Sequence, residues 1–181
     1  FKNKEVFISY VGSFHKGKGV DFLIKLAKNL EYLTFNIYGG LDEEIKELKK
    51  RVTKNVKFYG HLPNSKINNI LLKTDIALMP YQKIVSSVGH KDISKWMSPL
   101  KMFEYMSHKT VIISSNHKVL REVLNINNSF IIKNFKEIDW IKKIEYIIKN
   151  KKLAKKKAEQ AYRDAFKYTW LKRAELIING K

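Results

Sequence analysis

The sequence predicts an α/β fold: a Rossmann-like parallel sheet of about six strands, with helices on both faces and a helical C-terminal tail. First, short β-branched and aromatic runs alternate about six times with segments whose apolar residues recur at helical spacing. Second, the predicted strands are almost entirely apolar, which is typical of strands buried on both faces of a parallel sheet. Third, the chain beyond about residue 136 contains only helical patterns.

Three strands with their helices are predicted in the first half of the chain. The strands cover residues 5–11, 32–38 and 56–59, and they end at Gly12, Gly39 and Gly60. Residues 20–30 show apolar helical spacing, and residues 42–52 place acids first and bases last, which suits a helix dipole. A third helix, over residues 65–73, follows the turn at Pro63 and Asn64.

The second half continues the alternation and then becomes helical. A strand over residues 75–79 stops at Pro80, and residues 81–97 show no period. A connection of that length is often functional. The remaining elements are predicted as a helix over 98–106, a strand over 110–115, a short helix over 119–124, a strand over 129–132 and helices over 136–149, 151–168 and 171–178.

The size of the chain suits one domain, which we expect to cover residues 1–181. The sequence opens with Phe1, and a strand begins almost at once, so we expect it to be a piece of a longer protein. It contains no cysteine, which excludes disulfides and thiolate metal sites and fits a cytoplasmic setting. No apolar run approaches the roughly 20 residues that span a bilayer.

The charge is strongly basic, with 36 Lys and Arg against 17 Asp and Glu, a net charge of +19. Such a field attracts polyanions, among them nucleic acid, anionic lipid and phosphorylated substrates. Codon bias is the alternative, because lysine, asparagine and isoleucine are abundant throughout. Lysine far outnumbers arginine, which disfavours bidentate phosphate recognition as the purpose of the charge.

A glycine-rich turn follows the first predicted strand and precedes a helix. Ligands of open parallel sheets bind at the carboxyl ends of the strands, and glycine lets the backbone approach a phosphate. The turn is neither a P-loop nor a dinucleotide fingerprint. An ordinary turn carrying solvated lysines remains the alternative. The candidate donor-binding residues here are Gly12, Ser13, Lys16 and Lys18.

A second candidate anion site lies at the start of the helix over 98–106. Ser98 is a favourable N-cap and Pro99 suits the first helical position. The N–H groups of Leu100 and Lys101 would then point freely at an anion. Glu104 lies about one turn further and could accept two hydroxyls. The alternative is a common Ser-Pro helix start whose glutamate merely suits a first turn.

Ordered sequence blocks carry a more specific signal. They are Tyr-Val-Gly-Ser-Phe at 10–14 with Lys-Gly-Val-Asp at 18–21, Ile-Tyr-Gly-Gly at 37–40, and the segments 56–63, 75–80, 98–106, 121–124 and 168–174. Together they cover nearly the whole chain and resemble, in order, the C-terminal domain of glycosyltransferase family 4.

The resemblance implies one half of a two-domain GT-B enzyme. This half binds a nucleotide-activated sugar, a UDP- or GDP-sugar, and a preceding domain binds a glycan or lipid-linked acceptor. The family transfers a hexosyl-type sugar with retention and without a metal cofactor, often in cell-envelope polysaccharide biosynthesis. The absence of an Asp-x-Asp pattern agrees. Without its acceptor domain, the chain is expected to be inactive in transfer.

The resemblance also implies residue roles. Lys18 neutralises the leaving diphosphate, and Glu104, the second glutamate of a Glu-x7-Glu pattern, holds the ribose hydroxyls; these two are the expected catalytic residues. Gly12 closes the first strand. The base lies against Gly60, His61 and Leu62, and the donor phosphate and sugar are cradled by Ser98, Pro99, Leu100 and Lys101.

The sequence departs from the family at two positions. Trp96 stands where the first glutamate belongs, and Asp92 could substitute for it. Ser13 stands where arginine is frequent, and Lys16 could restore that charge. A non-catalytic, degenerate relative is therefore one alternative function. A basic polyanion-binding module is another, although no nucleic-acid motif is present and nucleic acid is not the expected partner.

Other aromatic, histidine and basic residues have less specific roles. Trp140 and Trp170 are expected as core anchors, and Trp96 either covers the donor or simply packs. We expect no metal site, because no histidine pair has ligand spacing. The basic run at 149–157 is either a solvated helix face or a contact with anionic membrane, which would place the protein peripherally on the inner membrane face.

Overall fold

The computed structural model describes residues 5–87, 89 and 91–180, and within them the chain forms a six-stranded sheet in the order β3-β2-β1-β4-β5-β6. All five strand pairings are parallel. This order, which reverses direction between β1 and β4, is that of a doubly wound Rossmann-like fold and confirms the predicted fold class. The strands are β1 Phe7–Val11, β2 Thr34–Tyr38, β3 Val56–Phe58, β4 Ile76–Met79, β5 Val111–Ser115 and β6 Phe130–Ile132.

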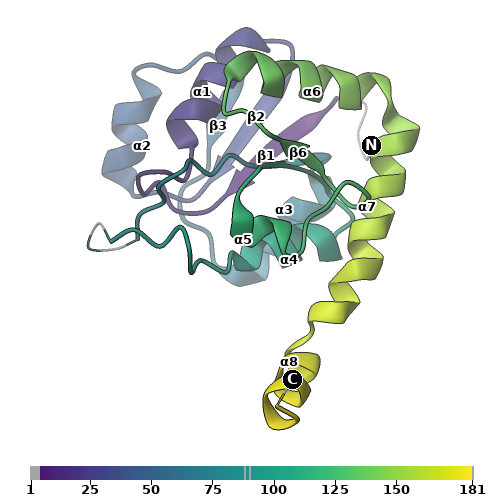
Figure 1. Cartoon of the computed structure of the whole chain (residues 1–181). Coiled ribbons are helices and arrows are strands. Elements are labelled where there is room, and N and C mark those ends of the chain that lie inside the picture. Colours follow the sequence, from purple (N-terminus) through teal and green to yellow (C-terminus); the bar gives the residue numbers. More distant parts are fainter. Residues whose placement is uncertain (1–4, 88, 90, 181) are drawn as a thin grey trace.

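Helices cover both faces of the sheet, as predicted (Figure 1). One layer contains α1 Val20–Asn29, α2 Asp42–Lys49 and α6 Glu137–Lys149. The opposite layer contains α3 Asn64–Lys73, α4 Leu100–Ser107 and α5 Lys118–Arg121. No helix in the described part of the chain is both long and apolar enough to span a bilayer.

Each helical layer has its own apolar core. The first core packs α1 and α6 on the sheet around Trp140, which is fully buried and lies 5.5 Å from the Phe22 ring. The second core packs α3, α4 and α5 on the other face, with Tyr105 and Met106 fully buried. Trp140 is thus the core anchor that the sequence predicted. The same prediction for Trp170 is wrong, because that side chain is 74% exposed.

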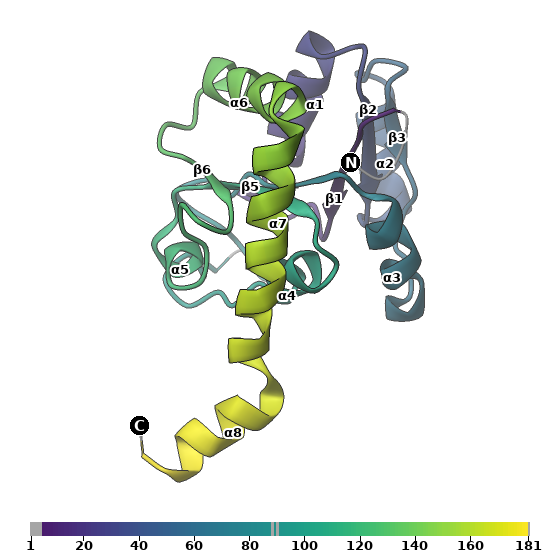
Figure 2. The same cartoon turned by 90° about the vertical axis from the view of Figure 1, so that its right-hand side faces the viewer.

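The helical tail crosses from one layer to the other. It consists of α7 Lys151–Ala165, the short 3-10 helix η1 Phe166–Tyr168 and α8 Trp170–Ile178. The predicted helix over 151–168 therefore ends its α-helical part at Ala165. Figure 2 shows α7 running from α6 past the β5–β6 edge of the sheet to α4, with α8 projecting from the body. Small side chains allow this close passage: Ala154 and Ala158 join the first core, and Ala161 joins the second.

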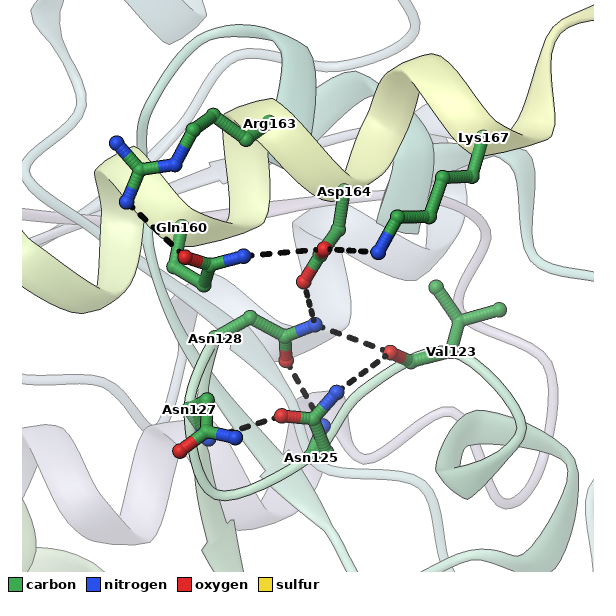
Figure 3. Close-up of polar contacts among 8 residues, drawn as sticks. All are labelled: Val123, Asn125, Asn127, Asn128, Gln160, Arg163, Asp164 and Lys167. Carbon is green, nitrogen blue, oxygen red and sulfur yellow. Dashed lines mark hydrogen bonds and ion pairs between the residues drawn. The ribbon is translucent and has the colours of Figure 1, made fainter.

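A buried carboxylate fastens the end of α7 to the loop before β6 (Figure 3). Asp164, which is 8% exposed, accepts hydrogen bonds from Asn128 Nδ2 at 3.0 Å, Gln160 Nε2 at 3.1 Å and Lys167 Nζ at 2.9 Å. Burial alone would raise the pKa of Asp164, but these three partners together lower it below its ordinary value. Asn128 in turn donates to the carbonyl of Val123 at 3.1 Å, so the loop is held by one continuous network.

Candidate functional site

The carboxyl ends of β1, β2 and β3 meet through glycine backbones. The Gly12 N–H donates to the Tyr38 carbonyl at 2.9 Å, and the Gly39 N–H donates to the Gly60 carbonyl at 2.6 Å. A Cβ atom at Gly39 would collide with the Gly12 carbonyl oxygen, so no larger residue fits there. Gly12 and Gly60 are thereby brought to one edge of the sheet, where the sequence predicted that a ligand binds.

Lys101 of α4 reaches across to the end of β1. Its ammonium group lies in the space where a Cβ atom at Gly12 would be, and 4.7 Å from the centre of the Tyr10 ring. It also lies 5.9 Å from the centre of the Tyr81 ring. The sequence pattern predicted a role only for the backbone N–H group of Lys101 and gave no signal for the position of its side chain.

Lys18 approaches the same aromatic side chain. Its ammonium group lies 5.1 Å from the centre of the Tyr81 ring. Burial lowers the pKa of Lys18. Burial, and secondarily the charge of Lys18, lowers the pKa of Lys101 to about 7, while the charge of Glu104 opposes this. Neither lysine forms an ion pair with another described residue, so two amino groups converge here without a paired carboxylate.

Tyrosines form the floor beneath these lysines. The Tyr10 hydroxyl donates to the Ser13 carbonyl at 2.8 Å, and the Tyr105 hydroxyl accepts from the Val11 N–H at 3.1 Å. Tyr81 is only 2% exposed. None of these three tyrosines was among the site residues predicted from the sequence. Two signals could have found them: Tyr105 follows Lys101 by four residues on one helix face, and Tyr81 directly follows the strand end at Pro80.

Glu104 belongs to the same group of residues. Glu104 follows Lys101 by three residues on α4, so the two side chains lie on one face of the helix, and the charge of Glu104 opposes the lowering of the Lys101 pKa. Glu104 forms no ion pair with another described residue and is half-buried. Gly12, Lys18, Lys101 and Glu104, which lie far apart in the sequence, therefore form one cluster at the carboxyl edge of the sheet. We call these four residues the lysine–glycine cluster.

The glycine-rich turn packs against the loop that follows β4. The Lys16 carbonyl accepts from the Ser86 N–H at 2.9 Å, and the Gly17 carbonyl accepts from the Gln82 N–H at 2.9 Å. A Cβ atom at Gly17 would collide with the Ile84 carbonyl oxygen. Gly17 thus permits close packing of the turn on the loop after β4, and the Lys16 and Ser13 side chains remain exposed.

The predicted start of α4 is wrong by two residues. The helix begins at Leu100, and Pro99 is the N-cap residue, with an extended ψ of 102° and no side-chain capping bond. Proline disfavours helical backbone in the residue before it, so Ser98 lies outside the helix. Ser98 is exposed and, with Leu100, lines a separate cavity of about 310 Å³ against Tyr168 and Trp170.

The amides expected to cradle an anion still lie at the helix start. The first backbone N–H bonded into the turn is that of Met102, to the Pro99 carbonyl at 3.0 Å, so the Leu100 and Lys101 amides precede it. His61 is exposed directly after Gly60, whereas Leu62 lines a groove of about 470 Å³ between α3 and the sheet. Contact of these residues with a nucleotide base stays a prediction.

A larger cavity, of about 740 Å³, opens between the loop over residues 81–97 and the ends of β5 and β6. Tyr81 forms part of its wall and separates it from the lysine–glycine cluster. Trp96 also lines it and is 82% exposed, so within the described chain it does not simply pack.

Asp92 lines this cavity, but its carboxylate is already engaged. One carboxylate oxygen accepts from the Ser94 N–H at 2.8 Å and from the Ser94 hydroxyl, which lower the Asp92 pKa. This bond holds the loop, so the suggestion that Asp92 replaces the missing glutamate is not favoured. Among the described residues, no group of three or more His, Asp or Glu could hold a metal ion.

Comparisons with known proteins agree with this architecture. The family model described as "Glycosyl transferases group 1" matches residues 1–164. An uncharacterized 41.2 kDa protein in the cps region of Klebsiella pneumoniae is 26% identical over 147 residues, which are 79% of this chain and 37% of that protein.

Two solved structures share the fold at low identity. Anabaena HepE in complex with UDP and glucose is 16% identical, with a TM-score of 0.78, and the match covers 97% of this chain and 48% of that one. The catalytic domain of cholesterol-α-glucosyltransferase from Helicobacter pylori is 19% identical, with a TM-score of 0.72 and coverage of 92% and 100%. The chain thus spans less than half the length of the Klebsiella and Anabaena proteins.

Proposed function

The chain belongs to the glycosyl transferases of group 1, and on that premise we propose that it binds a nucleotide-activated sugar as the donor half of a sugar-transferring enzyme. The single observation that carries this proposal is the convergence of Lys18 and Lys101 on Gly12 and Tyr81, without an ion pair to any described residue. Two such lysines at the carboxyl edge of a parallel sheet suit a diphosphate, whose charge would favour the protonated form of Lys101.

The cluster would act on the charge that develops during transfer. When the bond between sugar and phosphate breaks, negative charge grows on the diphosphate while the sugar becomes oxocarbenium-like. The ammonium groups of Lys18 and Lys101 and the first amides of α4 are preorganised donors for that charge. Loss of one such group raises the barrier by about 3 kcal/mol.

The remaining site residues would hold the nucleoside. The Glu104 carboxylate, which is in no ion pair with a described residue, suits the two ribose hydroxyls of a nucleoside diphosphate sugar. Gly60, His61 and Leu62 follow β3 and would lie along the base. The Anabaena structure with UDP and glucose supports a UDP-sugar as donor, with a GDP-sugar as the other candidate. Transfer proceeds with retention and without a metal.

The whole enzyme would be longer than this chain. An acceptor domain preceding it would bind a glycan or lipid-linked acceptor, and the chain alone would bind donor but transfer extremely slowly. The relative in a cps region supports a role in cell-envelope polysaccharide biosynthesis. Robust transfer by the isolated 181-residue chain would contradict this division of labour.

We place the protein in the cytoplasm, with peripheral contact to the anionic inner membrane face. α7 exposes Lys151, Lys152, Lys155 and Lys156, and α8 exposes apolar residues that include Trp170. Basic and apolar surfaces together bind anionic lipid. Co-sedimentation with phosphatidylglycerol vesicles but not with phosphatidylcholine vesicles is expected, and equal recovery with both would contradict membrane contact.

Calorimetry tests the donor site directly. UDP, GDP, ADP and CMP are titrated without metal into the wild-type chain and into the Lys101→Met and Glu104→Ala variants. Selective binding of one nucleoside diphosphate, weakened at least tenfold by each substitution, is expected. Lys28→Met removes an exposed lysine of α1 and serves as the matched charge control.

Two other outcomes would replace the proposal. Salt-sensitive binding of RNA with no nucleotide binding would identify a polyanion-binding module, which the net charge of +19 favours. Donor binding without turnover by the full-length protein would identify a degenerate relative, for which Trp96 is the strongest argument.

A further inference from the structure

The cavity of about 740 Å³ beyond Tyr81 has the size of a small-molecule site, because ligand pockets occupy roughly 300–1,000 Å³. It lies at the carboxyl edge of the sheet, bounded by the loop over residues 81–97 and the ends of β5 and β6. We call it the lysine cavity. The residues that determine its chemistry are Lys83, Lys95, Trp96, Lys118, Lys133 and Phe135.

The wall of the lysine cavity is positively charged. Four lysines line it against two acids, Asp92 and Glu122. The Asp92 carboxylate accepts hydrogen bonds from Ser94, whereas Glu122 forms no ion pair with another described residue. A concave surface with this balance concentrates anions. A neutral ligand could accept hydrogen bonds from these lysines but would lack the attraction between opposite charges.

The same wall also carries two exposed aromatic side chains. Trp96 and Phe135 are 82% and 39% exposed, and rings of this kind bind the C–H face of a sugar ring.

The cavity adjoins the proposed diphosphate site. The ammonium groups of Lys18 and Lys101 lie near the Tyr81 ring, and Tyr81 also lines the lysine cavity. A ligand in the cavity would therefore lie beside the leaving diphosphate, which is where the reacting sugars must be. Trp96, in place of a carboxylate, removes a negative charge that would repel an acidic sugar.

We propose that the lysine cavity binds a sugar unit that carries a carboxylate, held by the lysines while its ring stacks on Trp96. This inference rests on the proposed function, since it assigns the reacting sugar. The acidic unit belongs either to the donor or to the acceptor glycan. The chemistry of recognition is the same in both cases.

Tryptophan fluorescence can detect the binding of a sugar in the lysine cavity in the absence of any nucleotide. In a Trp170→Phe background, Trp140 is fully buried and Trp96 is the exposed emitter. Titration with glucuronate should change the emission and give an affinity at least tenfold higher than that of glucose. The change should vanish in Trp96→Phe. Equal responses to the two sugars, or no response to either, would overturn the proposal.

Matched variants test the role of charge. The double variant Lys118→Gln with Lys133→Gln should bind glucuronate at least tenfold more weakly than the wild type. The double variant Lys118→Arg with Lys133→Arg keeps the charge and should retain part of the affinity. Lys28→Gln with Lys152→Gln removes the same charge from exposed positions outside the cavity and should have no effect. An equal loss of glucuronate affinity in both double variants would mean that only the net charge of the protein matters, and it would contradict binding in the lysine cavity.

Nucleotide sugars distinguish the two sources of the acid. Tighter binding of UDP-glucuronate than of UDP-glucose, lost in the lysine pair variant, would place the acid on the donor. Equal binding of these donors, with glucuronate still bound in the presence of UDP, would place it on the acceptor. If UDP binds but no acidic sugar does, this inference fails alone. If glucuronate binds but no nucleotide does, the proposed donor site fails alone.

Discussion

The ammonium group of Lys101 fills the space above Gly12 in which any other residue would place its Cβ atom. The contact joins the start of α4 to the end of β1, two segments separated by nearly ninety positions. It also explains why the first strand must end in glycine, since a φ of 150° and the approach of Lys101 both exclude a side chain.

Gly12→Ala is therefore expected to expel the Lys101 ammonium group from the cluster. We expect at least a tenfold loss of nucleotide affinity, about 1.4 kcal/mol, and a loss of stability of roughly 1–2 kcal/mol from the strained backbone. Calorimetric titration and urea unfolding measure the two effects. Gly180→Ala, at a φ of 63° with nothing within 4 Å, is the control for backbone strain alone. Unchanged affinity in Gly12→Ala would contradict the role of the contact.

Nucleotide binding should take up a proton near neutral pH. Burial lowers the pKa of Lys101 to about 7, so a large share of the free protein carries a neutral amine at pH 7.5. A bound diphosphate favours the charged form and raises that pKa again. Calorimetry in buffers of different ionisation enthalpy should report uptake in the wild type and much less in Lys101→Met. Identical values in both would contradict the assignment.

Lys101 should also make stability depend on pH. Its pKa is 10.5 in the unfolded chain and about 7 in the folded protein, so the unfolded chain binds the extra proton between those values. The free energy of unfolding should therefore rise as pH increases from 7 to 10.5. Lys101→Met should reduce this slope and stabilise the protein at pH 7, by up to about 4 kcal/mol for a fall in pKa from 10.5 to about 7. A steeper rise of the free energy of unfolding with pH in the variant would contradict the lowered pKa of Lys101.

Asp164 is expected to be one of the most sensitive positions for stability. Asp164→Ala leaves Asn128 and Gln160 without their acceptor in a buried place and should cost about 3 kcal/mol in urea unfolding. Asp21→Ala removes the exposed ion pair with Arg51 and should cost less than about 1 kcal/mol. Because the pKa of Asp164 is lowered, its stabilisation should be lost as pH falls below about 4. Equal costs for both variants would contradict this ranking.

Most of the fold was predictable from local patterns. Strand ends at Gly12, Gly39 and Pro80 are visible as breaks in apolar runs, and the predicted element boundaries lie within about three residues of the observed ones for most elements. The exceptions have physical causes. Pro99 takes an extended conformation, which moves the start of α4 beyond Ser98. Trp170 has an amphipathic pattern around it, but α8 leaves the body and has no core to enter.

The candidate site was predictable in its residues but not in its geometry. Gly12, Lys18, Lys101 and Glu104 follow from motif order and family resemblance. The position of the Lys101 side chain depends on how α4 packs against β1, which no local pattern specifies. Gly17 and Gly19 also have a packing role that the sequence did not indicate, because they admit the carbonyls of Ile84 and Pro80.

Helix α7 couples the stability of the two apolar cores that lie on opposite faces of the sheet. Its alanines Ala154 and Ala158 belong to one core and Ala161 to the other, so neither core is complete without the same helix. Local opening of α7 would expose both cores at once, and the two helical layers should exchange their amide hydrogens as one cooperative unit. Protection gained when a nucleotide binds beside α4 would then extend to α1 and α6 on the far side of the sheet.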